Sequence, residues 1–550
     1  MKSKKNVSEN VFTMTYVILC LTSNSIQKQS VVKKKKRYTN ITRKMDDIKN
    51  QPMTNYDSDD LQRIIDELRC ENEKLRIKLK TKDEIEEVID GVIIGQDGQK
   101  KHSDYTRYRA PYYDRIKKLK PPSTLSRVPN FKKVQLSNNP LVLNGRPHGT
   151  LGLPIALTHP ILGAFQDNVS RGGIEPDSAS IETAIYLADA ACELSTGDEG
   201  SRKAPLVEIL NNYMGHDLGF TTYWFGNQRH TDGSITQRWG DFEAMIATIE
   251  MKQELSTGNG CAYLQLSAYY IEFIRKYEGM DVTLLSRLPA LLIYMTGPYI
   301  GVAGASFLGL PIIEPMTPLM PLYKSHNELL LLDTARILRA LKIAVTDLCN
   351  YYQQLAERHE PIHRQLTFPY VDHVRIGNIE AKLTYNKKID EKHMFIGHVE
   401  TIRHEVIIKF TTRYSEECHR ECQRLKIAPE LHACEKLPGG WYIVVMERLQ
   451  KYKMLHDLTP PSTRVIEAVK KAIKKMHDTG FVHGDLRGPN IMIGQNNSIK
   501  IIDFDWAGKE GNTIYPMHIN PGIKWHQDVG PGKPILRIHD KELLESEFTS

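Results

Sequence analysis

Hydrophobic residues recur at regular spacing in two long stretches of the chain. From about 180 to 357 the pattern predicts helices that surround short strands, which is typical of a mixed α/β fold. The predicted helices are Ile181–Leu194, Ala204–Met214, Gln265–Tyr277 and Glu328–Arg358, and the predicted strands are Met245–Lys252, Ala290–Met295 and Tyr299–Gly304. From 360 to 550 the pattern begins with strands, passes through helices and returns to short β segments, so it indicates a further folded domain.

A shorter stretch before these regions has apolar residues at a seven-residue repeat. The core positions of the repeat are Leu61, Leu68 and Leu75 at d, and Ile65, Asn72 and Leu79 at a. Leucine at d with one asparagine at a favours a parallel two-stranded coiled coil, because paired asparagines satisfy each other only in that register. This predicts a homodimer, although a single amphipathic helix packed on its own protein remains an alternative. The acidic residues at 57, 59 and 60 argue against a DNA-binding zipper, which needs a basic helix there.

These patterns divide the chain into five segments. We expect a disordered basic arm over 1–55, a coiled coil over 56–90, a linker and irregular segment rich in Gly, Pro and Tyr over 91–175, an α/β domain over 176–358, and a C-terminal domain over 359–550. The fold class is therefore multidomain α+β and α/β.

Charge is concentrated at the N-terminus. Residues 1–44 hold 11 Lys and Arg against one acid, so the rest of the chain has a net charge of only −3 out of the total of +7. The overall basicity is therefore no argument that the folded body binds nucleic acid.

The N-terminal apolar stretch Val11–Leu21 is too short to span a bilayer, and no other run is long enough for a stable membrane span. A secretion signal is the minority interpretation, because no small-residue cleavage site of the usual form follows it. Eight scattered cysteines form no disulfide framework. These features predict an intracellular protein of the nucleus or cytoplasm, with Lys33–Arg37 as a possible import patch.

Two motifs in the C-terminal region carry groups that phosphoryl transfer requires. A strand at Phe481-Val482 leads into His483-Gly484-Asp485, and Asn490 follows five residues after the aspartate. A second strand, Ser498–Ile502, delivers Asp503, which lies 18 residues after Asp485. Phosphoryl transfer needs a carboxylate beside the acceptor hydroxyl and ligands for the Mg²⁺ that bridges the phosphates. The motifs and their spacing indicate a catalytic loop followed by a metal-binding aspartate.

Upstream residues could complete a nucleotide site. The apolar strand Val406–Phe410 carries Lys409, and a helix is expected to start near Ser415. Glu417 and Glu421 lie one turn apart on that helix, so either could pair with Lys409. A strand at Trp441–Leu449 would enter the hinge, where backbone groups near Met446 and Glu447 would meet adenine.

This segment resembles atypical protein kinases. His-Gly-Asp-Leu followed by Asn490 is similar to the Bud-site and right-open-reading-frame kinases, and the sequences at 482–487 and 502–508 look more like the fungal-type kinase modules of crinkler-related proteins. The resemblance implies that ATP and Mg²⁺ bind here, and it favours Glu417 as the partner of Lys409. It makes Asp485 the catalytic base, Asn490 and Asp503 the Mg²⁺ ligands, and Arg487 the counterpart of a phosphate-contacting lysine.

The segment departs from the kinase pattern in three ways. Before Lys409 only Gly377 and Gly397 are available, so there is no glycine-rich loop. Asp505 replaces the usual glycine after Asp-Phe, and no Ala-Pro-Glu segment follows. The large lobe is therefore expected to be truncated.

The α/β region contains a second set of candidate residues. Asp232 lies in a turn, Glu250 and Lys252 share one face of a strand, and Gln265 lies on the next helix. Asp, Glu-x-Lys and Gln in this order are similar to restriction-endonuclease-like nucleases. The resemblance implies that the two carboxylates hold Mg²⁺ or Mn²⁺, that Lys252 orients the attacking water, and that Glu199 is an additional early acid. Crinkler-related proteins fuse such a module to a kinase-like one.

Three functions are consistent with the sequence. The favoured one is ATP·Mg²⁺-dependent phosphoryl transfer to protein Ser/Thr. The second is metal-dependent cleavage of nucleic acid, regulated by the kinase-like domain. The third is a pseudokinase scaffold dimerised by its zipper. Retention of Lys409, Asp485, Asn490 and Asp503 argues against the scaffold, and the missing glycine-rich loop favours it.

Overall fold

The structure is a computed structural model that describes most of the chain beyond residue 108. The described residues are 109–136, 140–193, 199–215, 218–226, 229–239, 241–254, 260–278, Met280, 282–324, 326–356, 366–389, 393–458 and 460–549. Every described residue belongs to one compact unit of the chain, Asp83–Ser550. The predicted basic arm and coiled coil lie outside the described residues.

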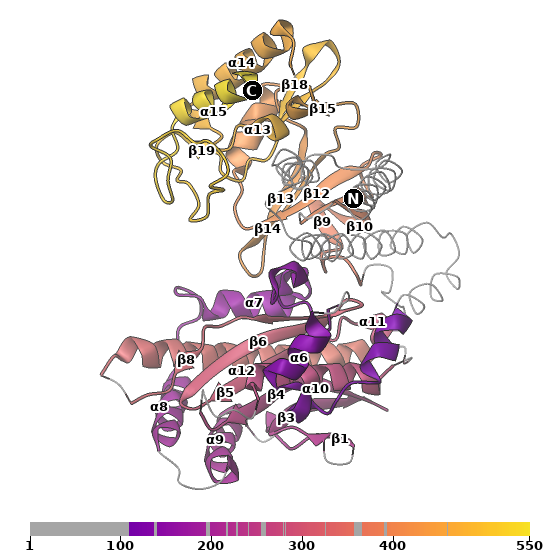
Figure 1. Cartoon of the computed structure of the whole chain (residues 1–550), viewed down its shortest axis with the longest axis vertical. Coiled ribbons are helices and arrows are strands. Elements are labelled where there is room, and N and C mark those ends of the chain that lie inside the picture. The colour runs from indigo at the N-terminus through magenta and orange to yellow at the C-terminus, as the bar shows by residue number, and fades with distance from the viewer. Residues whose placement is uncertain are drawn as a thin grey trace, which may run out of the picture. The chain divides into compact units, whose positions relative to one another are not determined.

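The α/β region is built on a mixed sheet with strand order β3-β4-β5-β6-β7, to which β8 is added by pairing with β6 (Figure 1). The strands are β3 (Gly233–Trp239), β4 (Phe242–Lys252), β5 (Ala290–Thr296), β6 (Tyr299–Phe307), β7 (Pro311–Pro315) and β8 (Met320–Pro321). Among the named strands of this sheet only β4 and β5 pair in parallel, with Ala247 opposite Leu291. A small separate sheet pairs β1 (Trp224–Gly226) with β2 (Arg229–His230).

Helices cover this sheet and supply the crossover between its parallel strands. They are α5 (Pro122–Leu125), α6 (Val128–Gln135), α7 (Pro160–Val169), α8 (Ser178–Cys192), α9 (Glu199–Met214), α10 (Ala262–Lys276), α11 (Val282–Leu285) and α12 (Glu328–Ala356). The crossover helix α10 packs on β4 and β5, while α12 packs on β3, β4 and α8. Nearly all of β4 is consequently buried, which explains its almost continuous apolar sequence.

From Arg109 onward, the segment that we expected to be a linker and irregular structure (91–175) contains short helices. Its short helices α5, α6 and α7 hold only 4, 8 and 10 residues, so no sustained period is visible in the sequence. Individual apolar side chains nevertheless reach the core, and Ile116, Leu141 and Phe165 are almost fully buried. These three residues therefore belong to the α/β core.

The C-terminal region begins with a six-stranded antiparallel sheet in the order β13-β14-β12-β11-β10-β9. The strands are β9 (His373–Ile376), β10 (Ile379–Ile389), β11 (Met394–Val399), β12 (Val406–Thr411), β13 (Leu431–Leu437) and β14 (Trp441–Glu447). Between β12 and β13 lies α13 (Glu416–Arg424), which starts at Ser415 because the Ser415 hydroxyl accepts a hydrogen bond from the Cys418 N–H.

Helices and short strands follow this sheet. They are α14 (Thr463–Asp478), α15 (Arg537–Thr549), β15 (Lys453–Met454), β16 (Phe481–Val482), β17 (Ile491–Ile493), β18 (Ile499–Ile501) and β19 (Gly508–Lys509). The expected apolar stripe of α14 is confirmed, since Val465, Val469, Ile473 and Met476 are buried in one cluster with Phe504. That cluster supports the loops that follow β16 and β18.

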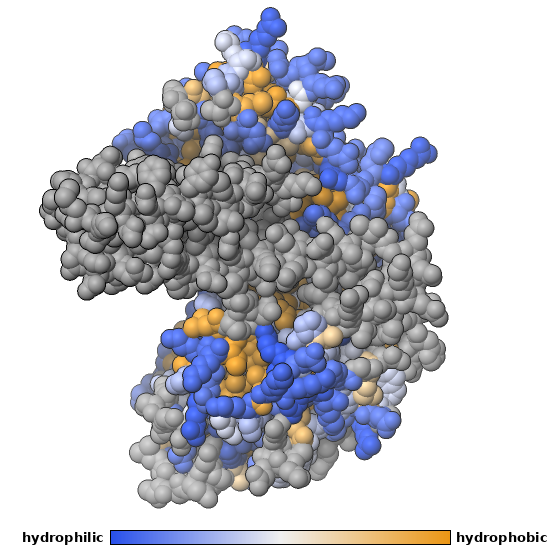
Figure 2. Space-filling model, turned by 45° about the vertical axis from the view of Figure 1, so that its right-hand side comes forward, coloured by the Kyte–Doolittle hydropathy of each residue, from blue (hydrophilic) through white to orange (hydrophobic). Residues whose placement is uncertain are grey.

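Polar side chains cover most of the visible described surface, and apolar residues gather in smaller patches between them (Figure 2). No helix within the described residues is long and apolar enough to cross a membrane.

Candidate functional site

The loop after β16 is anchored by the buried carboxylate of Asp540. Asp540 on α15 is fully buried, and its two oxygens accept hydrogen bonds from the backbone N–H groups of His483 and Gly484, both at 2.8 Å. His477 of α14 lies 3.0 Å from the same carboxylate. The His483 ring in turn lies 3.0 Å from the carbonyl oxygen of Ile502, next to Asp503. One carboxylate thus fixes the loop to both helices.

Gly484 has a conformation that other residues rarely adopt. Its φ is +81°, and a Cβ atom at this position would lie 2.8 Å from Ile535. A glycine at this position therefore lets the loop pass close to the chain before α15 and deliver Asp485.

Asp485 is surrounded by donors. The Arg487 guanidinium donates to both of its carboxylate oxygens, from Nε at 2.6 Å and from Nη2 at 2.9 Å. The side-chain amide of Asn490 donates to the Asp485 carboxylate at 3.0 Å and to its backbone carbonyl at 2.8 Å. Because the Asn490 nitrogen faces Asp485, its amide oxygen is left as the acceptor that a cation could use.

Asp503 is delivered at the end of β18 in a strained backbone conformation. Its φ is +72°, which is uncommon for a residue other than glycine and is typical of functional sites. Its carboxylate forms an ion pair with the ammonium group of Lys409 from β12. Asp505 forms a second ion pair with the same ammonium group. Lys409 is therefore enclosed by two carboxylates.

The structure does not bring Glu417 to Lys409. Glu417 is largely exposed and lies 3.4 Å from Lys509, while Glu421 pairs with Arg424 at 2.6 Å. The reason is the orientation of α13, whose inner face carries Cys418, His419 and Cys422. Neither glutamate on this helix occupies the expected position beside Lys409.

The two proposed hinge residues lie at the end of β14. Met446 is buried and packs against Leu431 and Val444. The Glu447 N–H donates to the carbonyl oxygen of Glu430 at 2.8 Å, so this group is already used within the sheet. Adenine contact near these residues stays a prediction.

The residues present fit a nucleotide with a divalent cation. Lys409 offers a positive charge for phosphates, and the Asp503 carboxylate with the Asn490 amide oxygen offers the oxygen ligands that Mg²⁺ prefers. Asp485 would lie beside the acceptor hydroxyl. The donor set is therefore chemically suited to ATP and Mg²⁺.

A second candidate site lies at the ends of β3 and β4 in the α/β region. Gly233 pairs with Ile249, so Asp232 lies across from Glu250. The Asp232 carboxylate accepts from the Met251 N–H at 2.7 Å and from the Lys203 ammonium at 2.8 Å. Lys252 donates to Glu250 at 2.7 Å. Both predicted acids and Lys252 are thus brought together.

Glu250 is the most perturbed acid of this second site. It is 1% exposed, and its second carboxylate oxygen has no hydrogen-bond partner among the described residues. Burial, together with the nearby Asp232, raises the pKa of Glu250 to about 8, although the positive charge of Lys252 opposes the shift. A buried carboxylate with an unused oxygen is suited to bind a cation.

The remaining predicted residues of this site differ in how closely they approach it. Gln265 donates to the Tyr269 hydroxyl at 2.9 Å, and Tyr269 donates to the His230 carbonyl at 2.6 Å, so α10 reaches the chain just before Asp232. Glu199 begins α9, and its side chain lies outside the described part of the structure. Within the described residues, no group of three or more His, Cys, Asp or Glu side chains could hold a metal ion.

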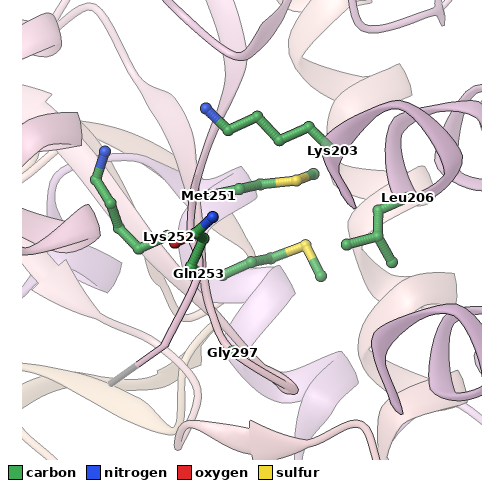
Figure 3. Close-up of a pocket in the computed structure, with 7 residues that line it drawn as sticks. Lys203, Leu206, Met251, Lys252, Gln253 and Gly297 are labelled. Atoms are coloured by element: carbon green, nitrogen blue, oxygen red, sulfur yellow. The ribbon is translucent and has the colours of Figure 1, made fainter. Parts of the chain in front are cut away.

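A pocket lies beside the second site. Figure 3 shows Lys203 and Leu206 entering from α9, and Met251, Lys252 and Gln253 from the end of β4. Both lysines of the site therefore line one pocket, next to the two acids that they contact.

Sequence reasoning missed three residues of these sites. Lys203 and Asp540 lie on helices with no motif around them, and only the folded structure brings them to Asp232 and to the loop after β16. In the sequence, Asp505 stands out only because it replaces a glycine. Its negative charge could have indicated a partner for Lys409, because a carboxylate two residues after Asp503 lies within reach of that lysine.

Comparison with known proteins identifies the C-terminal region. Residues 379–519 match the family model of the protein kinase domain. Over 136 residues the chain is 29% identical to mitogen-activated protein kinase kinase kinase dlk-1 of Caenorhabditis elegans, which covers 23% of this chain and 12% of that protein.

Among solved structures, the Cydia pomonella granulovirus kinase PK-1 matches with 15% identity and a TM-score of 0.21, over 24% of this chain and 53% of that one. The chain thus spans 12% of the curated relative and about half of the viral kinase. The family match covers Lys409, Asp485, Asn490 and Asp503, and residues 379–519 are accordingly a protein kinase domain.

Proposed function

We propose that the kinase domain transfers the γ-phosphoryl group of ATP to a protein Ser or Thr hydroxyl, as an atypical kinase. The observation that carries this proposal is the ion pair between Lys409 and Asp503, two residues 94 positions apart in the sequence. The name of the dlk-1 relative describes a kinase that acts on another kinase, which supports a protein acceptor.

Each polar residue of the site has a role in this proposal. Asp485 accepts the proton of the acceptor hydroxyl, and Arg487 steadies the Asp485 carboxylate and contacts phosphate. Lys409 neutralises the phosphate groups of ATP. Asp503 and Asn490 hold Mg²⁺, which when bound neutralises charge that develops on the transferred group.

The full-length chain, incubated with labelled ATP, Mg²⁺ and a mixture of protein acceptors, tests the proposal. We expect label on serine or threonine with the wild type and none with Asp503→Asn. Lys533→Ala, an exposed site apart from these residues, is the matched control and should behave as the wild type. Equal labelling by wild type and Asp503→Asn would reject the proposal.

For the α/β region we propose a restriction-endonuclease-like domain that cleaves nucleic acid with Mg²⁺ or Mn²⁺. The observation that favours this second function is the buried Glu250 carboxylate, which has an unpartnered oxygen among the described residues and lies next to Asp232 and Lys252. The mixed sheet, with α10 crossing between parallel strands β4 and β5, is compatible with such a fold. Lys252 orients the attacking water and neutralises developing charge.

A supercoiled plasmid and a single-stranded RNA, each incubated with the intact protein and Mn²⁺ or Mg²⁺, test this second function. Cleavage should be lost in Lys252→Ala and kept in Lys324→Ala, whose lysine is exposed and pairs with Asp189 at 3.1 Å. Cleavage that persists in Lys252→Ala would come from a contaminant or from another site.

The two proposals together describe a crinkler-related chain in which a kinase domain follows a nuclease-like domain. If neither phosphoryl transfer nor cleavage is observed, the dimerised pseudokinase scaffold is the function that remains.

A further inference from the structure

The acids of α13 are all engaged away from Lys409. Glu416 accepts from Arg420 at 2.7 Å, Glu421 accepts from Arg424 at 2.6 Å, and Glu417 lies 3.4 Å from Lys509. All three pairs are at least partly exposed. The helix next to Lys409 therefore supplies it with no carboxylate.

The inner face of α13 is neutral instead. The Tyr414 hydroxyl lies 2.6 Å from His419 Nδ1, and His419 Nε2 lies 3.0 Å from the carbonyl oxygen of Pro429. Because a carbonyl oxygen can only accept, Nε2 carries the proton and Nδ1 accepts from Tyr414. Burial lowers the pKa of His419 to about 4, so the ring is uncharged at neutral pH. Lys409 lies over the Tyr414 ring, at 5.8 Å from its centre.

Asp505 supplies the missing carboxylate. One of its oxygens pairs with Lys409, and the other lies 3.1 Å from the hydroxyl of Thr411, which is two residues further along β12 on the same face. Burial raises the pKa of Asp505, while Lys409 favours its charged form. The carboxylate is thus fixed at both oxygens by one strand.

We propose that Asp505 is a positioning residue that holds Lys409 against Asp503, in place of a glutamate from α13. This inference rests on the proposed kinase function, since it assigns Lys409 to the phosphates of ATP. It implies that the acid at the position of the usual glycine is required for nucleotide binding. It also implies that α13 can move without breaking the ion pairs of Lys409.

Nucleotide affinity in the presence of EDTA isolates the contribution of Lys409, because no metal then bridges Asp503 and the phosphates. With the intact protein we expect Asp505→Asn to raise the Kd for ATP about tenfold, because Lys409 loses one of the two charged partners that hold its ammonium group in place. Asp505→Glu should recover part of the affinity. Glu417→Gln should change the Kd less than about twofold, and Glu416→Gln serves as the matched control.

A double-mutant cycle decides whether Asp505 acts through Lys409. In a Lys409→Met background, Asp505→Asn should cause no further loss of ATP affinity. An undiminished loss in that background would overturn the proposal. A loss that occurs only with Mg²⁺ present would make Asp505 a metal ligand instead, and a loss caused by Glu417→Gln would restore the acid on α13.

The same cycle measured by thermal unfolding without nucleotide separates this inference from the proposed function. Coupling between Lys409→Met and Asp505→Asn in the unfolding midpoint is expected, with none between Lys409→Met and Glu417→Gln. If the wild type binds no ATP, the kinase function fails while this coupling can still be measured. Absence of the coupling would reject the role of Asp505 itself.

Discussion

The charged residues of both sites are paired within the protein, because an isolated buried charge is costly. Lys409 pairs with Asp503 and Asp505, Arg487 pairs with Asp485, and Lys252 pairs with Glu250. A phosphate or a metal ion therefore has to exchange partners with these groups when it binds. The effect of a substitution on ligand binding therefore depends on which member of an ion pair it removes.

If Asp503 holds Mg²⁺ as proposed, Asp503→Asn should abolish Mg²⁺-dependent ATP binding, because the amide keeps the shape of the side chain but loses its negative charge. Calorimetric titration of the folded variant with ATP and Mg²⁺ measures this effect. Unchanged affinity would remove Asp503 from the metal site.

Asp485→Asn should leave ATP binding largely intact and lower turnover by about 100-fold or more, since a general base acts on the acceptor and not on the nucleotide. Titration and steady-state phosphorylation with the same preparation separate the two effects. A loss of binding, with turnover of the bound fraction preserved, would mean that the roles of Asp485 and Asp503 are exchanged.

Glu250 should make the stability of the protein depend on pH. Its pKa in the folded protein is raised to about 8 by burial, from 4.5 in the unfolded chain. Between these values the folded state binds more protons, so the free energy of unfolding falls as the pH rises from about 4.5 to about 8.

Glu250→Gln removes the titrating group and should flatten this part of the profile. Thermal unfolding midpoints are to be measured at pH 6 and pH 9 without divalent cations. From pH 6 to pH 9 the midpoint should fall by several degrees more in the wild type than in Glu250→Gln. Parallel profiles would contradict the raised pKa.

Helices and strands with a strong hydrophobic period could be predicted from the sequence to within a few residues. The stripe of α14, the strand with Lys409 and the strand with Glu250 are examples. The spacing of the two kinase motifs also placed Asp485 and Asp503 within the region that matches a protein kinase domain. These features are local, so a short window of sequence contains them.

The ion-pair partners could not be predicted in the same way, because they join distant elements. Glu417 has the right sequence distance from Lys409, but the rotation of α13 turns it toward Lys509. Lys203 and Asp540 approach their partners only after α9 and α15 have packed. Tertiary packing, and not the local sequence pattern, determines which charged side chains form ion pairs.

The structural effect of α15 can be tested through Asp540. Asp540→Asn puts an amide nitrogen against the backbone N–H of either His483 or Gly484, so two donors face each other in a buried position. We expect a destabilisation of about 3–5 kcal/mol, as for other buried charged groups that lose a partner. Denaturant unfolding followed by tryptophan fluorescence measures it.

Glu542→Gln on the same helix is the control for this substitution. Glu542 is half exposed and lies 3.5 Å from His526, so its loss should cost less than about 1 kcal/mol. Equal destabilisation by the two substitutions would show that the carboxylate of Asp540 is not what fixes the loop after β16.

On the scale of the whole molecule, the chain carries two candidate sites with unrelated chemistry in its described part. The two sites are built on different sheets, and the hydrogen bonds that hold Asp232 and Asp485 lie within their own regions. Substitutions in one site are therefore expected to leave the chemistry of the other intact. Asp503→Asn and Lys252→Ala provide the two reciprocal tests.

The oligomeric state is set, in our prediction, by the heptad repeat through Leu61–Leu79, which lies outside the described residues. Leucine at d and one asparagine at a favour a parallel pair of helices. Light scattering of the intact protein at micromolar concentration should report twice the chain mass of 62.9 kDa, and deletion of residues 56–90 should give a monomer. Asn72→Leu should keep the chains associated but relax the choice of two strands, because the buried asparagine specifies that number at a cost in stability. A monomeric full-length protein would reject the coiled coil and favour an amphipathic helix packed on its own chain.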